Sequence, residues 1–272
     1  MILAGGFGTR LREETEFKPK PMVQIGGKPI LWHIMKLYSH YGFYRFIICL
    51  GYKADTIKDY FLNYRMQHVD FTINTKTGSV AEHKINEEEW EVTLVDTGID
   101  CLTGGRVARA AKYVDTDKFL LTYGDGLSNV NISKLLQYHE SHGKLVTLTG
   151  IEIPSRFGNL ELDGDQIKNF AEKTKSSGAW INGGFFIIDR KFLKYLSIDS
   201  KCVLEQEPLK DVALDKQLMI YKHNGFWQCM DTLREYELLE KLWQNGAPWK
   251  VWQDEKLDFR GAIKDKVFQA GL

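Results

Sequence analysis

A glycine-rich loop near the N-terminus holds residue types that suit phosphate binding. The run from Leu3 to Leu11 contains three glycines and Arg10, and Lys20 follows in a Lys-Pro-Lys-Pro-Met segment. Glycines let backbone N–H groups approach phosphate oxygens closely, and a guanidinium adds a fixed fork of donors. Three glycines alone also fit a plain turn, but Arg10 and Lys20 favour a phosphate site. The loop matches neither a dinucleotide fingerprint nor a Walker loop, since Leu11 replaces the third glycine and no Gly-Lys-Ser/Thr follows.

One aspartate stands where a sheet would present it to a ligand. Asp125 follows the hydrophobic run Lys118 to Tyr123, and open α/β sheets bind ligands at the carboxyl ends of their strands. An Asp-Gly pair is also a common turn, so the position rather than the residue type favours function. For Asp231 a helix N-cap is an equally good interpretation.

Strand and helix patterns alternate around these residues. Strands are expected at Met1 to Ala4, Tyr44 to Leu50, Val92 to Val95, Lys118 to Tyr123 and Leu145 to Ile153, and helices at Pro29 to Tyr41, Asp55 to Tyr64 and after an Asn131 cap. The second half adds a hairpin over residues 159–170, a long strand at Ala179 to Ile188, strands at Met219 to His223 and Phe226 to Met230, and a helix at Thr232 to Gln244. This order predicts an α/β fold, a Rossmann-like, mixed but mainly parallel sheet flanked by helices, with a small β-rich part.

Composition excludes several classes of protein. The 272 residues carry 36 basic and 36 acidic side chains, which argues against a nucleic-acid partner. No apolar run is long enough for a membrane span, and the four dispersed cysteines indicate reduced thiols in a cytoplasmic protein. We expect one domain over residues 1–252 and a C-terminal extension of unknown role over residues 253–272.

An ordered series of motifs covers most of the chain and resembles the nucleotidyltransferases that make nucleotide sugars. Within that family the set is most similar to the glucose-1-phosphate cytidylyltransferases. The motifs are LAGGFGTRL (3–11), PKPM (19–22), GGKPILWHIM (26–35), VDTG (95–98), TGGR (103–106), TYGDG (122–126), RFG (156–158), INGGFF (181–186), EQEPL (205–209), FWQ (226–228) and MDT (230–232).

The resemblance implies a role for individual residues. Arg10 and Lys20 would be catalytic, and Asp125 and Asp231 would bind Mg²⁺. The nucleotide would be held by Leu3, Ala4, Gly5, Gly6, Gly8, Thr9, Arg10, Thr97, Gly98, Cys101, Thr103, Gly104, Arg106 and Gly124. The sugar phosphate would be held by Gly158, Glu172, Lys173 and Asn182, although Glu172 and Lys173 also fit a solvated surface pair.

The implied reaction joins CTP and glucose 1-phosphate into CDP-glucose and pyrophosphate, which feeds the synthesis of dideoxysugars and surface polysaccharides such as O-antigen. A phosphate oxygen attacks the α-phosphorus, so alignment and charge neutralisation matter more than a general base. The resemblance also implies a homo-oligomer, with a hexamer as one form. Two alternatives stay open: a UDP- or dTDP-sugar synthase of the same fold, and a sensor that binds nucleotide sugars without turnover.

Overall fold

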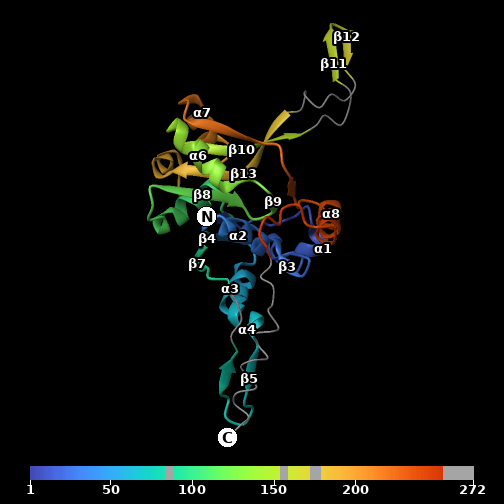
Figure 1. The fold of residues 1–272 in the computed structure, drawn as a ribbon. Helices are drawn as coiled ribbons and strands as arrows, with labels where there is room; N and C mark the ends of the chain where they lie inside the picture. The colour runs from blue at the N-terminus through green and yellow to red at the C-terminus, as the bar shows by residue number, and fades with distance from the viewer. Residues whose placement is uncertain (84–87, 154–158, 172–178, 254–272) are drawn as a thin grey trace.

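A seven-stranded sheet forms the centre of the molecule (Figure 1). The computed structural model describes residues 1–83, 88–153, 159–171 and 179–253. In spatial order the strands are β14 (Leu218–His223), β10 (Val146–Ile153), β13 (Ala179–Asp189), β8 (Lys118–Tyr123), β1 (Ile2–Leu3), β4 (Arg45–Leu50) and β7 (Glu91–Asp96). Only β13 runs antiparallel to its neighbours. The mixed, mainly parallel sheet expected from the sequence is therefore confirmed.

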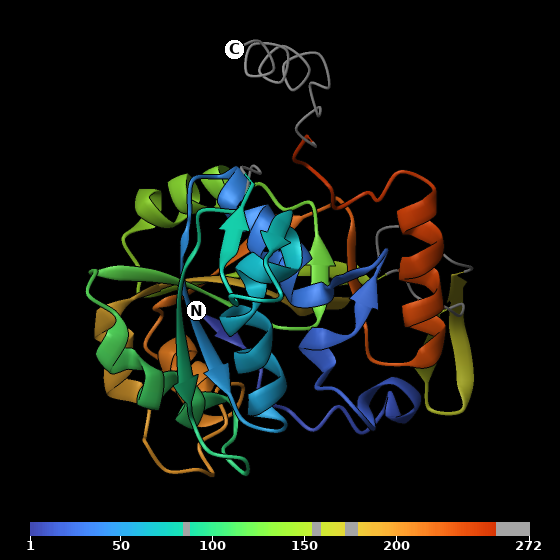
Figure 2. The ribbon, with the colours of Figure 1, turned by 90° about the horizontal axis from the view of Figure 1, so that it is seen from below.

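Helices cover both faces of this sheet. The longer ones are α2 (Ile30–His40), α3 (Ala54–Leu62), α5 (Thr103–Ala110), α6 (Ile132–His142), α7 (Glu207–Leu214) and α8 (Leu233–Gln244). The short ones are α1 (Arg12–Thr15), η1 (Lys20–Met22), α4 (Tyr64–His68), η2 (Ala111–Tyr113) and η3 (Arg190–Tyr195). Figure 2 shows α8 along one flank, next to the segment with the paired strands β2 (Gln24–Ile25) and β3 (Lys28–Pro29).

The two faces have separate hydrophobic cores. Ile2 packs in one core with α2 and α6, and the next residue, Leu3, packs in the other with α5 and α7. Successive side chains of a strand point to opposite faces, so a continuous apolar run is what a doubly covered strand requires. Burial of β1 on both sides fixes the start of the glycine loop that follows it.

Local sequence signals account for several element boundaries. The Asn131 side chain accepts a hydrogen bond from the Lys134 N–H at 2.9 Å and caps α6. Thr232 and Glu235 form a capping box at the start of α8. The expected hairpin is present as β11 (Asn159–Asp163) and β12 (Gln166–Ala171).

The structure also contains elements that the sequence did not predict. The hairpin β5 (Phe71–Ile73) and β6 (Val80–Glu82) extends away from the sheet at one end of the molecule, and β11–β12 lies at the opposite end (Figure 1). Helices α5 and α7 were also not expected, because motifs rather than helical periodicity stood out there. In the described residues no helix has the length and apolar content needed to cross a membrane.

The parallel strands β1, β4, β7 and β8 present their carboxyl ends at one edge of the sheet. The glycine loop follows β1 and Asp125 follows β8 there, while β9 (Gly126–Ser128) pairs with β15 (Trp227–Cys229) beside them. This edge is where the candidate site forms.

Candidate functional site

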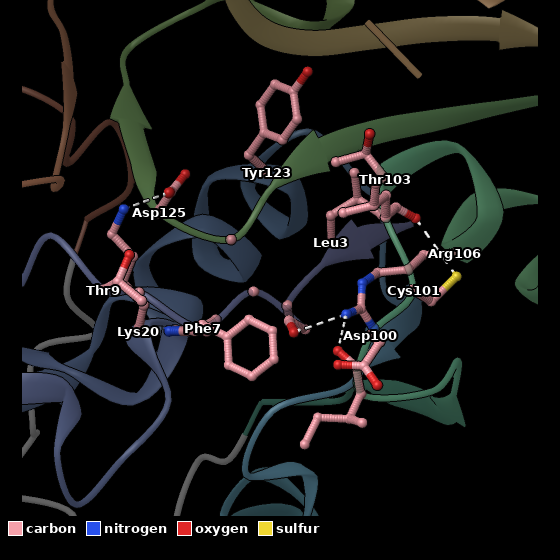
Figure 3. A pocket seen from close by; sticks show the side chains of 18 of the residues that line it. Leu3, Phe7, Thr9, Lys20, Asp100, Cys101, Thr103, Arg106, Tyr123 and Asp125 are labelled. Atoms are coloured by element: carbon pink, nitrogen blue, oxygen red, sulfur yellow. Dashed lines mark hydrogen bonds and ion pairs between the residues drawn. The ribbon is translucent and has the colours of Figure 1, made fainter. Parts of the chain in front are cut away.

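The glycine loop lines a cavity of about 320 Å³ at this edge (Figure 3). Two of its glycines are required for different reasons. Gly8 has a φ of +64°, which side-chain-bearing residues rarely adopt. A Cβ on Gly5 would lie 2.2 Å from a guanidinium nitrogen of Arg106. The loop therefore combines backbone freedom with close packing on a buried cation.

Arg106 joins the loop to the ends of two neighbouring strands. It is 4% exposed, and its two terminal nitrogens donate at 2.7–3.1 Å to oxygens of Gly5, Leu50, Thr97, Gly98 and Ile99. Burial lowers the pKa of Arg106, yet an arginine stays protonated in proteins. This residue holds the wall of the cavity in place, with its charge matched by carbonyl dipoles.

Lys20 lies between the two aspartates predicted as metal ligands. Its Nζ donates to Asp125 Oδ2 at 2.7 Å and to Asp231 Oδ1 at 2.5 Å, and Arg10 contacts the other oxygen of Asp231 at 3.0 Å. Burial by itself would lower the pKa of Lys20, but the two carboxylates outweigh it and raise the pKa. The result is a cluster of two cations and two carboxylates at the mouth of the cavity.

Asp125 and Asp231 are far apart in the sequence, and they meet because β9, the strand after β8, pairs with β15. The antiparallel pair β9–β15 aligns Gly126 with Cys229, and the Met230 N–H donates to the Asp125 carbonyl at 2.9 Å. This brings Asp231 beside Asp125. The N-cap interpretation of Asp231 is wrong, since Thr232 caps the helix.

A second cavity of about 240 Å³ adjoins the first across this cluster. Arg10, Tyr123 and Asp125 line both cavities, and Asn182 lines only the second. Trp227 closes part of its wall and donates from Nε1 to the Gly183 carbonyl at 2.8 Å. Two ligands can thus approach the charged cluster from two sides.

Most of the residues predicted to bind nucleotide line the first cavity. They are Leu3, Ala4, Gly5, Gly6, Gly8, Thr9, Arg10, Cys101, Thr103, Arg106 and Gly124. Thr97, Gly98 and Gly104 do not line this cavity. Thr97 is 1% exposed and its hydroxyl donates to the Leu50 carbonyl, while a Cβ on Gly104 would lie 2.6 Å from the sulfur of Cys202. Gly158, Glu172 and Lys173 lie outside the described residues.

Sequence reasoning missed several residues of the two cavities. In Figure 3 the half-exposed ring of Phe7 stands in the open part of the first cavity, and it contacts the Tyr52 ring with centroids 5.3 Å apart. Tyr123 lines both cavities, yet its position directly before Gly124-Asp125 was the only signal for it. Ile99, Asp100 and Leu102 also line the first cavity, and Cys229 the second.

The donor set around Lys20 fits a divalent cation. Oxygens of Asp125 and Asp231 converge on one position, now held by an ammonium group, and carboxylate oxygens are the ligands that Mg²⁺ prefers. Cys229, Asp231 and Glu235 also lie close together. Burial raises the pKa of the Cys229 thiol to about 12, and Glu235 accepts from the backbone N–H groups of Asp231 and Thr232. That group therefore suits a metal less well.

Comparison with known proteins agrees with this geometry. Residues 1–228 match the nucleotidyl transferase family. The chain is 51% identical to a glucose-1-phosphate cytidylyltransferase of Salmonella typhi over 93% of this chain and 99% of that protein. It is 47% identical to a probable glucose-1-phosphate cytidylyltransferase of Bacillus subtilis over the same shares of the two chains.

Solved structures show the same fold. HddC from Yersinia pseudotuberculosis superposes with a TM-score of 0.63 and 25% identity, over 89% of this chain and 97% of that one. A putative glucose-1-phosphate thymidylyltransferase from Bacillus anthracis gives a TM-score of 0.67 at 16% identity, over 94% and 96%. At that identity the second match bears on the fold alone.

Proposed function

The chain belongs to the nucleotidyl transferase family, and from this premise we propose that it transfers the cytidylyl group of CTP to glucose 1-phosphate, giving CDP-glucose and pyrophosphate. The observation that carries the proposal is the joint placement of Lys20, Asp125 and Asp231 between two cavities. A transfer between two anionic substrates needs this arrangement, because both substrates must reach one place where positive charge offsets their mutual repulsion.

The first cavity would hold CTP. The glycine loop offers backbone N–H groups and Arg10 offers a cationic fork, which together match a triphosphate. The segment from Ile99 to Thr103 forms the far wall, where a base and ribose would lie beyond the phosphates. The second cavity, with Asn182, would hold glucose 1-phosphate.

We propose that Asp125 and Asp231 hold Mg²⁺ during the reaction. Bound there, the ion would neutralise part of the charge of the triphosphate. Within the protein, Lys20 balances the same two carboxylates and so keeps them close together before substrates bind.

The chain's own residues account for alignment and charge compensation. An oxygen of the sugar phosphate attacks the α-phosphorus, the bond to the bridging oxygen breaks, and pyrophosphate leaves opposite the attacking atom. Lys20 and Arg10 lie at the junction of the cavities, where negative charge spreads in the transition state. The attacking phosphate is already ionised, so no side chain has to remove a proton.

Two other functions are less well supported. A UDP- or dTDP-sugar synthase would share the fold and the charged cluster, but the two relatives reported above are named as cytidylyltransferases. A sensor of nucleotide sugars would have no need of a lysine between two carboxylates at the junction of two cavities. One assay distinguishes both alternatives from the proposed reaction.

The assay is pyrophosphate release with glucose 1-phosphate and Mg²⁺, run in parallel with CTP, UTP, dTTP, GTP and ATP. We expect rapid release with CTP alone. Release with another nucleotide would keep the mechanism and overturn the choice of base. No release with any nucleotide, while CTP still binds, would favour the sensor.

We also propose that the enzyme works in the cytoplasm as a homo-oligomer that supplies surface-polysaccharide synthesis. All four cysteines are free, as in reducing compartments. The hairpin β5–β6 exposes Phe71, Ile73 and Val80, and an isolated two-stranded hairpin is marginally stable at best. Light scattering of the purified chain tests the oligomer, since a strictly monomeric mass would contradict it.

A further inference from the structure

A chain of hydrogen bonds connects the two cavities through a residue that lines neither of them. The Glu205 carboxylate accepts from the Thr103 hydroxyl at 2.6 Å through Oε2 and from the Tyr123 hydroxyl at 2.5 Å through Oε1. Asn182 then donates from Nδ2 to the Tyr123 oxygen at 3.1 Å. Thr103 belongs to the wall of the first cavity and Asn182 to that of the second.

The position of the single Tyr123 proton follows from this arrangement. A carboxylate only accepts hydrogen bonds, and a phenol has one proton to donate. The proton must therefore point to Glu205, which leaves the phenolic oxygen to act as an acceptor. One of its acceptor positions receives the Asn182 amide, and among the described residues no second donor contacts it.

The orientation of Asn182 is fixed as well. Its Oδ1 accepts from the backbone N–H of Gly184 at 2.9 Å, so the amide cannot exchange its oxygen and nitrogen without losing that bond. Nδ2 carries two protons, and only one goes to Tyr123. Tyr123 and Asn182 both line the second cavity, and their hydrogen bond places an acceptor, the Tyr123 oxygen, directly beside a donor, the Asn182 amide.

We propose that Glu205 is a positioning residue for sugar recognition, which orients the Tyr123 hydroxyl so that Tyr123 and Asn182 together bind one hydroxyl group of the sugar phosphate. An adjacent acceptor and donor complement a hydroxyl, since a hydroxyl both donates and accepts. The inference rests on the proposed function, because it assigns a hydroxylated substrate to the second cavity.

The surroundings hold Glu205 firmly in this position. The Leu204 N–H donates to the Thr103 oxygen at 2.9 Å, and the Gly105 N–H donates to the Cys202 carbonyl at 3.1 Å, so the segment before α7 is fixed to the start of α5. Burial, reinforced by the Glu205 carboxylate, raises the pKa of Tyr123. The phenol therefore keeps its proton at neutral pH.

The test compares Glu205→Gln, Tyr123→Phe and the double variant in steady-state assays. Glutamine replaces one acceptor oxygen with a donor, so the Tyr123 and Thr103 hydroxyls can no longer both donate to it. We expect each single variant to raise the KM for the sugar phosphate by roughly tenfold, as for a lost hydrogen bond, and to raise the KM for CTP much less. The double variant should be no worse than Tyr123→Phe, because both substitutions remove the same acceptor.

Deoxy analogues of the sugar phosphate give a second readout. Wild type should reject the analogue that lacks the recognised hydroxyl, since a site built for a hydroxyl leaves polar groups unpaired without it. Tyr123→Phe and Glu205→Gln should reduce this discrimination. If Glu205→Gln fails to fold, Glu205→Asp takes its place, and it should also show a raised sugar KM.

Two control variants carry the same types of substitution at residues that do not line the cavities. Glu207→Gln alters an exposed carboxylate on α7, and Tyr195→Phe breaks a tyrosine–carboxylate pair with Asp215 on the surface. Neither should change either KM. Equal losses for both substrates in Glu205→Gln, or additive effects in the double variant, would overturn the proposal and leave Glu205 a structural residue.

Failure of the proposed function is distinguishable from failure of this inference. If wild type prefers another nucleotide or sugar phosphate, the same comparisons are made with that sugar phosphate. If wild type has no turnover, calorimetric binding of glucose 1-phosphate to wild type and to the three variants replaces the KM. Unchanged affinity in Tyr123→Phe would then reject the inference.

Discussion

At the scale of single residues, Lys20 is held between two carboxylates. It is nearly buried, and both of its partners are carboxylates that the sequence assigned to a metal. The same residue thus stabilises the unliganded site and contributes charge to the reaction. These two roles are separable by experiment.

Lys20→Ala is expected to lower kcat by about a hundred- to a thousandfold, the usual loss for one group that stabilises developing charge. Steady-state pyrophosphate release measures it, with circular dichroism to confirm the fold. Lys58→Ala, a partly exposed lysine of α3, serves as the control and should retain wild-type kcat. A kcat of Lys20→Ala within twofold of wild type, which is a change of about 0.4 kcal/mol in activation free energy, would contradict a catalytic role.

Removal of Lys20 should also make the fold depend on the metal. Without the ammonium group, Asp125 and Asp231 repel each other, and a bound cation relieves this repulsion. We expect Mg²⁺ to raise the Tm of Lys20→Ala more than that of wild type. Lys20→Ala with Asp231→Asn should lose the extra stabilisation. Equal shifts in all three proteins would place the metal elsewhere.

At the scale of elements, the strand ends are held together by one buried guanidinium. Arg106 contacts the loop after β1, the last residue of β4 and the segment that follows β7. The sequence placed Arg106 in a nucleotide-binding motif, but it gave no sign that the residue sits in the wall and bonds to backbone oxygens. Every residue has a backbone carbonyl, so residue types do not reveal which carbonyls accept from Arg106, and only the folded structure shows them.

Arg106→Lys is expected to destabilise the protein by roughly 3 kcal/mol, because a single ammonium cannot replace a planar fork among buried acceptors. The KM for CTP should rise as well, since the glycine loop loses its anchor. Urea unfolding measures the first effect. The exposed Arg65→Lys should stay within about 0.5 kcal/mol of wild type, and an equally small change for Arg106→Lys would show that the contacts carry little energy.

Much of the fold follows from local patterns, and much of the site does not. Strand β8 was expected with its observed bounds from its apolar run, α6 was expected from its Asn131 cap, and α8 was expected from its helical period. The network of Tyr123, Glu205 and Asn182 was not foreseen, because it joins three elements across more than 50 residues of sequence. Hydrogen bonds between distant side chains depend on topology, which local propensity does not encode.

At the scale of the whole molecule, stability should depend on buried histidines. His33 is fully buried on α2, and its ring lies against the rings of Trp243 and Trp249. Its Nε2 lies 2.9 Å from the Ile25 carbonyl and its Nδ1 lies 3.4 Å from Trp249 Nε1. The carbonyl requires a proton on Nε2 and the indole N–H requires a bare Nδ1, so only the neutral tautomer satisfies both.

Burial lowers the pKa of His33 from 6.5 to about 4. Between these values the unfolded chain binds a proton that the native protein does not, so the free energy of unfolding falls as the pH drops. His33 alone should contribute a loss of about 3 kcal/mol by the lower end of this window. Urea unfolding across the window measures it.

His33→Gln should be less stable at neutral pH but less sensitive to acid than wild type. The exposed His40→Gln is the control and should keep the wild-type pH dependence. An unchanged acid sensitivity in His33→Gln would assign the effect to other groups. His139, whose pKa burial also lowers to about 4, would then be the next residue to replace.

In the proposed reaction the α-phosphorus of CTP is transferred to the phosphate of glucose 1-phosphate at the junction of the two cavities. The most direct measurement uses CTP labelled with ³²P at either the α or the γ position, followed by separation of the products. We predict that the α label appears in CDP-glucose and the γ label in pyrophosphate. Label from the γ position in a sugar product, or no labelled nucleotide sugar at all, would rule out this transfer.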